Sequence, residues 1–120
     1  MVHSVPRLRV VFYRSDTGRE PVREWLKGLN KNARTEVGRD IRVVQFKWPV
    51  GMPLVRFLGE GLLELRSRHA GGEARVIFLT DRNRMVLLHA FRKKSRKTPK
   101  KELQLARRRE AKWHMGGSVQ

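Results

Sequence analysis

Hydrophobic positions change their spacing along the chain, and the changes predict strands and helices in turn. Leu8, Val10 and Phe12 recur at every second position, which is typical of a strand with one buried face. After Gly18 the period becomes helical, and Pro21 suits a first helical turn. The apolar stripe of this helix comprises Val22, Trp25, Leu26 and Leu29.

A second helix is predicted almost at once and ends before Pro49. Its apolar face comprises Ala33, Val37, Ile41, Val44 and Trp48. Because the link between the two helices is short, we expect them to form an antiparallel hairpin.

Four short strands and a last helix complete the pattern. The strands are predicted at 54–58, 62–66, 74–80 and 85–91, separated by turn-forming residues. Connections this short require antiparallel pairing. Thr98 is the expected cap of the last helix and Pro99 its first residue, followed by an apolar stripe through Leu103, Ala106 and Trp113.

The predicted fold class is therefore α+β, with the order β-α-α-β-β-β-β-α. We expect a twisted antiparallel sheet with the helical hairpin on one side and a basic C-terminal helix. With 120 residues, of which 39% are hydrophobic, the chain has apolar material for one core. Residues 1–113 are predicted to form a single domain, and 114–120 a disordered tail.

Charge narrows the function. The formal net charge is +17, and the segment from Arg92 to Lys112 holds eleven Lys or Arg residues against two acids, Glu102 and Glu110. Such clustering favours a polyanionic partner, because neutralised phosphates release condensed counterions. No Trp/Phe/Leu-rich face lies opposite these cations, so nucleic acid is favoured over a membrane surface.

Several kinds of chemistry are disfavoured. The chain has no cysteine, which excludes disulfides and thiolate ligands and fits a reducing compartment. His3, His69 and His114 lack ligand-like spacing, and the acids are few and scattered, so we expect no metal and no cofactor. No apolar run approaches the roughly 20 residues of a membrane span, and the N-terminus lacks a signal-peptide pattern, so the predicted location is cytoplasmic.

Four sequence blocks carry a family resemblance over residues 8–112. They are Leu63-Glu64-Leu65-Arg66, Arg75-Val76-Ile77-Phe78, Leu87-Leu88-His89-Ala90-Phe91-Arg92-Lys93-Lys94 and Lys97-Thr98-Pro99. In this order they resemble the RelE/ParE superfamily of toxins, in its phage-derived HigB-like branch. The resemblance implies a RelE-like fold and a toxin that cuts mRNA in the ribosomal A site. It also implies a cognate antitoxin, of the helix-turn-helix type in HigB-like pairs, and the ribosome and mRNA as partners.

Strand register places the candidate catalytic residues. A hairpin through Gly71-Gly72 pairs Arg66 with Arg75, so both guanidinium groups share one face of the sheet. A second hairpin with Thr80 opposite Arg84 would place His89 opposite Arg75 and Phe91 and Lys93 on the same side.

This set suits metal-free RNA cleavage, in which a 2′-hydroxyl attacks the adjacent phosphorus and leaves a 2′,3′-cyclic phosphate. Arg66 and Arg75 are candidates to stabilise the developing charge, since a guanidinium clamps two phosphate oxygens. Lys93 or Lys94 is the candidate general acid or base, and His89 is the alternative. Each also has a structural interpretation: the cations as a solvated face, His89 as a half-buried residue.

Further residues are candidates for binding RNA or the ribosome: Arg68, Phe91, Arg92, Arg96, Lys97, Lys100 and Lys101. Phe91 would either stack a base or pack in the core. Two alternative functions stay open. One is a ParE-like toxin that inhibits DNA gyrase, and the other is a nucleic-acid-binding protein without catalysis.

Overall fold

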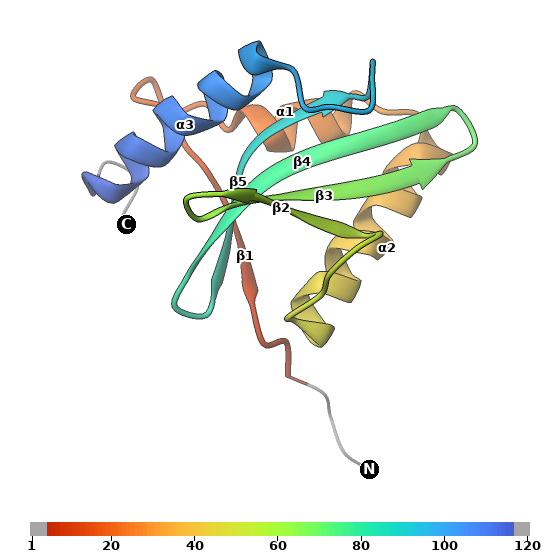
Figure 1. The fold of residues 1–120 in the computed structure, drawn as a ribbon, viewed down its shortest axis with the longest axis horizontal. Coiled ribbons are helices and arrows are strands. Elements are labelled where there is room, and N and C mark those ends of the chain that lie inside the picture. The colour runs from red at the N-terminus through yellow and green to blue at the C-terminus, as the bar shows by residue number, and fades with distance from the viewer. Residues whose placement is uncertain (1–4, 117–120) are drawn as a thin grey trace.

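The computed structural model describes residues 5–116, with the elements in the predicted order (Figure 1). The elements are β1 (Arg9–Phe12), α1 (Pro21–Lys27), α2 (Lys31–Lys47), β2 (Val55–Gly59), β3 (Leu62–His69), β4 (Gly72–Asp81), β5 (Arg84–Arg92) and α3 (Lys100–His114). No helix within this part of the chain is both long and apolar enough to cross a bilayer.

The strands form one mixed sheet in the order β1-β5-β4-β3-β2. β2 to β5 pair antiparallel, as predicted, but β1 pairs parallel with β5, so a wholly antiparallel sheet is wrong. The two helices carry the chain from β1 to β2 at the far edge. This leaves the edge of β5 for β1, a long-range choice that the local pattern does not specify.

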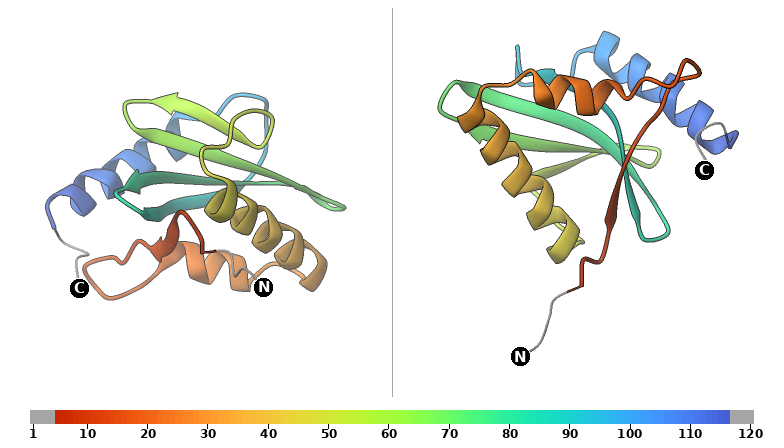
Figure 2. Two further views of the ribbon diagram at one scale, coloured as in Figure 1. Left: turned by 90° about the horizontal axis from the view of Figure 1, so that it is seen from below. Right: turned by 180° about the vertical axis from the view of Figure 1, so that it is seen from behind.

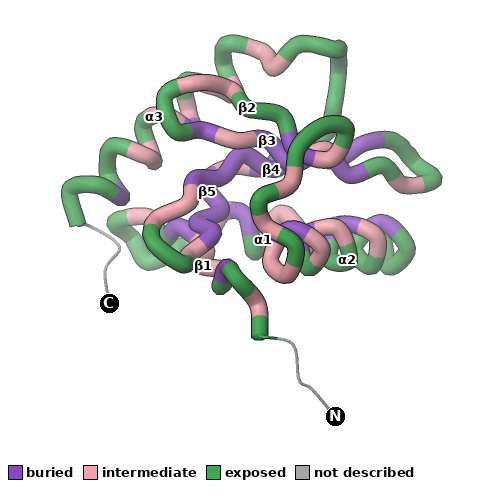
Figure 3. The backbone as a smooth tube through the Cα atoms, turned by 60° about the horizontal axis from the view of Figure 1, so that its bottom comes forward, coloured by how far each residue is buried: buried purple, intermediate pink, exposed green. Residues whose placement is uncertain are grey.

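Helices cover both faces of the sheet. α1 and α2 lie together on one face and α3 lies apart from them on the other (Figure 2). Val22, Val37 and Val44 pack on Phe78 and Leu87 on the first face. On the second face the buried cluster includes Ile77, Val86, Leu88, Ala106 and Trp113. The central strands are consequently the most buried part of the molecule (Figure 3).

The two N-terminal helices do not pack along one another as the predicted hairpin. α1 lies on β5 and α2 lies on β3. α1 has only 7 residues, and both helices direct their apolar stripes at the sheet. Burial against strands therefore determines their directions more than the short link does.

The start of α3 differs from the prediction. Helix geometry begins at Lys100, and Pro99 occupies the N-cap position without a side-chain cap. Thr98 does not cap the helix, because its Oγ1 donates to Glu64 Oε2 at 2.8 Å. The helix runs to His114, one residue into the predicted tail, and residues 117–120 of that tail lie outside the described residues.

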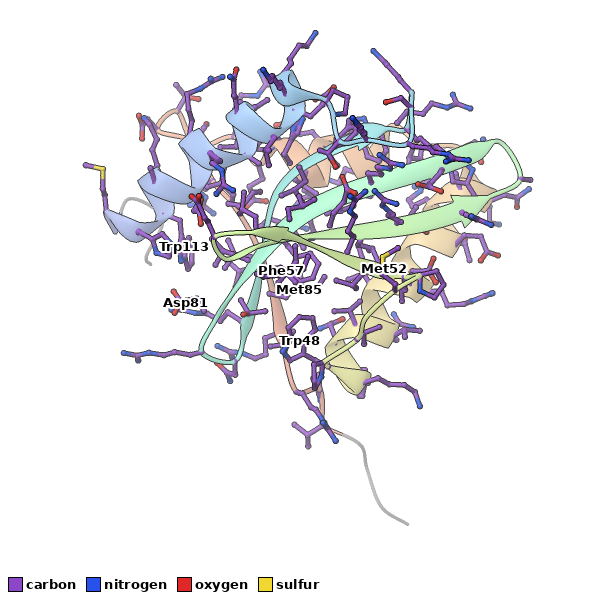
Figure 4. The ribbon with its side chains drawn as sticks, in the orientation of Figure 1. Trp48, Met52, Phe57, Asp81, Met85 and Trp113 are labelled. Atoms are coloured by element: carbon purple, nitrogen blue, oxygen red, sulfur yellow. The ribbon has the colours of Figure 1, made fainter. Side chains whose placement is uncertain are left out.

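Trp113 fastens the end of α3 to the β4–β5 turn. Its Nε1 donates to Asp81 Oδ2 at 2.9 Å, and Arg84 lies over the ring at 5.2 Å. Trp113 and Asp81 lie close together in Figure 4. This contact fixes α3 across the face of the sheet on which the candidate residues lie.

The register confirms one predicted pair and corrects another. Arg66 lies opposite Arg75. On β5, however, Arg75 lies opposite Phe91, and His89 lies opposite Ile77. The turn closes one residue tighter than predicted, and a β-bulge near Leu88 adds a further shift.

Candidate functional site

Polar side chains form three rows across the end of the sheet, on the face covered by α3. The rows are Glu64–Ile77–His89, Arg66–Arg75–Phe91 and Arg68–Glu73, the last extended by Lys93, whose N–H donates to the Glu73 carbonyl. Acids and arginines thus alternate along β3 and β4. Residues 93–99, here called the strap, cross above the rows and lead into α3.

Arg66 is held between a glutamate and the strap. Its Nε donates to Glu64 Oε1 at 2.9 Å, and its Nη2 donates to the carbonyl of Arg96 at 3.3 Å. Glu64 is fully buried, and its second oxygen accepts the hydroxyl of Thr98. A buried carboxylate with both oxygens bonded orients the guanidinium firmly.

Arg75 repeats this arrangement one strand away. Its Nε donates to Glu73 Oε2 at 3.0 Å, and its Nη1 donates to the carbonyl of Lys97 at 3.3 Å. The side chain is only 1% exposed, so the predicted half-exposed position is wrong. The strap covers it, and a phosphate reaches Arg75 only where the strap moves aside.

Glu73 stays ionised below the usual range of a carboxyl group. Burial favours the neutral acid, but the hydrogen bond and charge of Arg75 and the charges of Lys93 and Arg66 outweigh burial, so the pKa of Glu73 is lowered. The carboxylate therefore remains a charged partner for Arg75.

His89 is fully engaged by α3. Nε2 lies 2.6 Å from Glu102 Oε1, and Nδ1 lies 3.4 Å from Arg109 Nη1. Because a guanidinium only donates, Nδ1 accepts and Nε2–H donates to Glu102. Burial lowers the pKa of His89, with Arg109 acting in the same direction and Glu102 opposing it. Neither ring nitrogen is free for substrate, so this geometry favours the structural interpretation of His89.

Phe91 does not present a face for base stacking. The residue is 7% exposed, and its ring stacks on His89 with the centroids 5.5 Å apart. Of the two predicted roles for Phe91, the structure favours core packing.

A cleft of about 600 Å³ opens beside the rows, at the free edge of β3 beyond the start of β2. Its cations are Arg56, Arg66, Arg68, Arg75, Lys93 and Arg96; its acids are Glu36, Asp40 and Glu73; Met52, Pro53 and Leu54 complete it. The volume is in the range of small-ligand sites, roughly 300–1,000 Å³.

The remaining predicted cations are exposed around this cleft. Lys94 is exposed and does not line the cleft, although Lys93 does. Arg92 donates to the carbonyl of Gly71 in the β3–β4 turn. Lys97, Lys100 and Lys101 are exposed on the strap and the first turn of α3.

Acidic residues are the part of the site that sequence reasoning missed. Glu64, Glu73 and Glu102 lie among the cations, although the acids look scattered along the chain. Glu-x-Arg occurs once on β3 and once on β4, and residues i and i+2 of a strand share a face. That spacing was the available signal. Among residues 5–116, no group of three His, Asp or Glu is placed to hold a metal ion.

Comparison with known proteins identifies the family. No curated protein matches the chain. Residues 24–111, which include α2, the cleft and most of α3, match the family described as phage-derived protein Gp49-like (DUF891). The chain therefore belongs to the Gp49-like family, a toxin-like family related to RelE and HigB.

Proposed function

We propose that this Gp49-like protein is the toxin of a toxin–antitoxin pair and cuts mRNA on the ribosome. Cleavage would proceed by attack of a 2′-hydroxyl on the adjacent phosphorus, without metal. The observation that carries the proposal is the pair of arginines, Arg66 and Arg75, each held through Nε by a glutamate and each directing Nη atoms at the strap.

Phosphate oxygens are better partners for these Nη atoms than the strap carbonyls are. Both Nη–carbonyl distances are 3.3 Å, whereas charge-assisted N–H···O⁻ bonds measure about 2.7–2.9 Å. A bound phosphate would replace the two carbonyls while the glutamates keep the guanidinium groups oriented. By analogy with oxyanion holes, each donor contributes about 2.7–4 kcal/mol to the transition state.

Lys93 is the candidate proton donor to the leaving 5′-oxygen. It lines the cleft, is exposed, and follows β5 directly beside Glu73. Lys94 lies outside the cleft lining and has a weaker claim. His89 is committed to Glu102 and Arg109, so we assign it to the support of α3.

Dependence on the ribosome follows from what the cleft lacks. Its cations hold a phosphate, but no described residue is placed to align the 2′-oxygen, phosphorus and leaving oxygen. Such alignment is worth about 7–11 kcal/mol. The ribosomal A site would supply it, and free RNA would be bound through its backbone with little cleavage.

A cognate antitoxin is the expected inhibitor, because toxin-like families act in pairs. We propose a helix-turn-helix antitoxin with an acidic or apolar segment that covers the basic face. Its failure to bind or to rescue growth would count against the toxin assignment.

Expression from a tightly repressed promoter, followed by mapping of transcript ends, tests the activity. Arg66→Lys and Arg75→Lys keep the ion pairs and charge but lose the fork that clamps two oxygens. We expect both variants to lose growth arrest and to stop producing new 5′-hydroxyl ends. Arg42→Lys, on the exposed surface of α2, is the matched control and should stay toxic. Full toxicity of Arg75→Lys would place the active site elsewhere.

The burial of Arg75 favours one alternative, a nucleic-acid-binding protein without catalysis. This protein would arrest growth or bind RNA without new transcript ends. A ParE-like gyrase inhibitor would instead block DNA supercoiling in a purified assay. Transcript mapping and the supercoiling assay together separate the three functions.

A further inference from the structure

The cleft has a second wall, of opposite charge, that phosphate binding does not use. Glu36 and Asp40 come from α2, on the other side of the β3 edge from the arginine rows. A phosphate would avoid this wall because of like-charge repulsion. Carboxylates here face a different part of a bound nucleotide, one that offers hydrogen-bond donors.

Asp40 is fixed in position as an acceptor. Its Oδ2 accepts the hydroxyl of Ser67 at 2.7 Å, and Ser67 is fully buried in β3. Among residues 5–116, no group donates to the other oxygen, Oδ1. Glu36 differs, because both of its oxygens lie near Arg39 at 3.4–3.5 Å. Asp40 is therefore the better oriented of the two carboxylates.

We propose that Asp40 recognises a guanine base while the cations opposite hold the adjoining phosphate. This inference rests on the proposed function and specifies its substrate. Guanine presents two neighbouring donors, N1–H and the N2 amino group, and a carboxylate accepts both. In adenine and cytosine a ring-nitrogen acceptor adjoins the amino group, and in uracil carbonyls flank N3–H. Each of those acceptors repels one carboxylate oxygen.

The test is binding of the four nucleoside 5′-monophosphates to the purified, full-length protein, followed by NMR titration. The four ligands share one phosphate, so differences in affinity report the base. We expect guanosine monophosphate to bind about tenfold tighter than the uridine compound, within the discrimination typical of a bidentate contact. This assay needs neither the ribosome nor cleavage.

Asp40→Asn supplies the decisive comparison. The amide still accepts from Ser67, so the fold is kept, but its NH₂ group opposes the donors of guanine. We expect the guanine preference to disappear while affinity for the uridine compound changes less than twofold. Glu24→Gln, which removes the same charge from the exposed surface of α1, should keep the preference.

Two results would overturn the inference: an unchanged guanine preference in Asp40→Asn, or no measurable preference in the wild type, including no binding at all. Neither result bears on transcript cutting, which Arg66→Lys and Arg75→Lys test separately. Conversely, a guanine preference without new transcript ends would leave Asp40 as a base-recognition residue and remove the ribonuclease proposal.

Discussion

At the scale of single residues, the consequence of replacing an arginine depends on the glutamate behind it. Arg75 is 1% and Glu73 9% exposed, so Arg75→Ala would leave a buried carboxylate without its main partner. Breaking such a pair typically costs about 3–5 kcal/mol. We expect Arg75→Ala to lower the free energy of unfolding by this order, measured by urea denaturation.

Arg75→Lys is the companion measurement, because it keeps a cation beside Glu73. Its free energy of unfolding should lie well above that of Arg75→Ala. Equal stability of Arg75→Ala and the wild type would show that the ion pair contributes nothing to the fold. The alanine variant alone is therefore a poor probe of activity, since loss of function could reflect loss of folded protein.

His89 gives stability a pH dependence of defined sign. Its pKa is lowered in the folded protein, chiefly by burial, so the unfolded chain binds the proton more tightly. The free energy of unfolding should decrease as pH falls below about 6.5, the ordinary histidine value, and this contribution should level off below the folded pKa. In His89→Gln this part of the decrease should be absent.

Thermal or urea unfolding between pH 5 and 7.5 checks this expectation. The quantity of interest is the wild type minus His89→Gln, because contributions of the other histidines and of the acids cancel. A difference that stays constant across this range would contradict the assigned shift.

At the scale of elements, the strap is tied down at one point that a small change can release. Thr98 donates to the fully buried Glu64. Thr98→Val keeps the shape but leaves one carboxylate oxygen without its donor, which should cost about 1–3 kcal/mol. Amide hydrogen exchange of residues 93–99 should accelerate, whereas Thr98→Ser should behave as the wild type. Unchanged exchange in Thr98→Val would show that other contacts hold the strap.

The elements themselves could be predicted because their signals are local. Periodicity located every strand and helix, and the short turn at Gly71-Gly72 placed Arg66 opposite Arg75. The bulge near Leu88, the parallel pairing of β1 and the commitment of Thr98 to Glu64 depend on segments far apart in the chain. No local pattern encodes them, which is why the site was predicted as a set of residues but not as an arrangement.

At the scale of the whole molecule, the charges of the chain are sorted by location. Acids concentrate in and beside the cleft, where they neutralise neighbouring arginines. The net charge of +17 is consequently expressed on outer surfaces, including Lys100, Lys101 and Arg108, which are exposed. RNA approaching from a distance encounters those surfaces before it encounters the cleft.

The alternation of glutamate and arginine along β3 and β4 therefore has a kinetic consequence. Neighbouring opposite charges cancel beyond a few ångströms, so the cleft exerts little attraction at long range and governs how long RNA stays. The uncompensated cations of α3 govern how fast it arrives. Replacing Lys100, Lys101 and Arg108 by alanine should slow association and reduce the salt dependence by about 0.7 in log–log slope per phosphate lost. Arg66→Lys should mainly accelerate dissociation, and stopped-flow mixing with labelled single-stranded RNA distinguishes the two effects. Capture and retention would then be separately adjustable properties of one small protein.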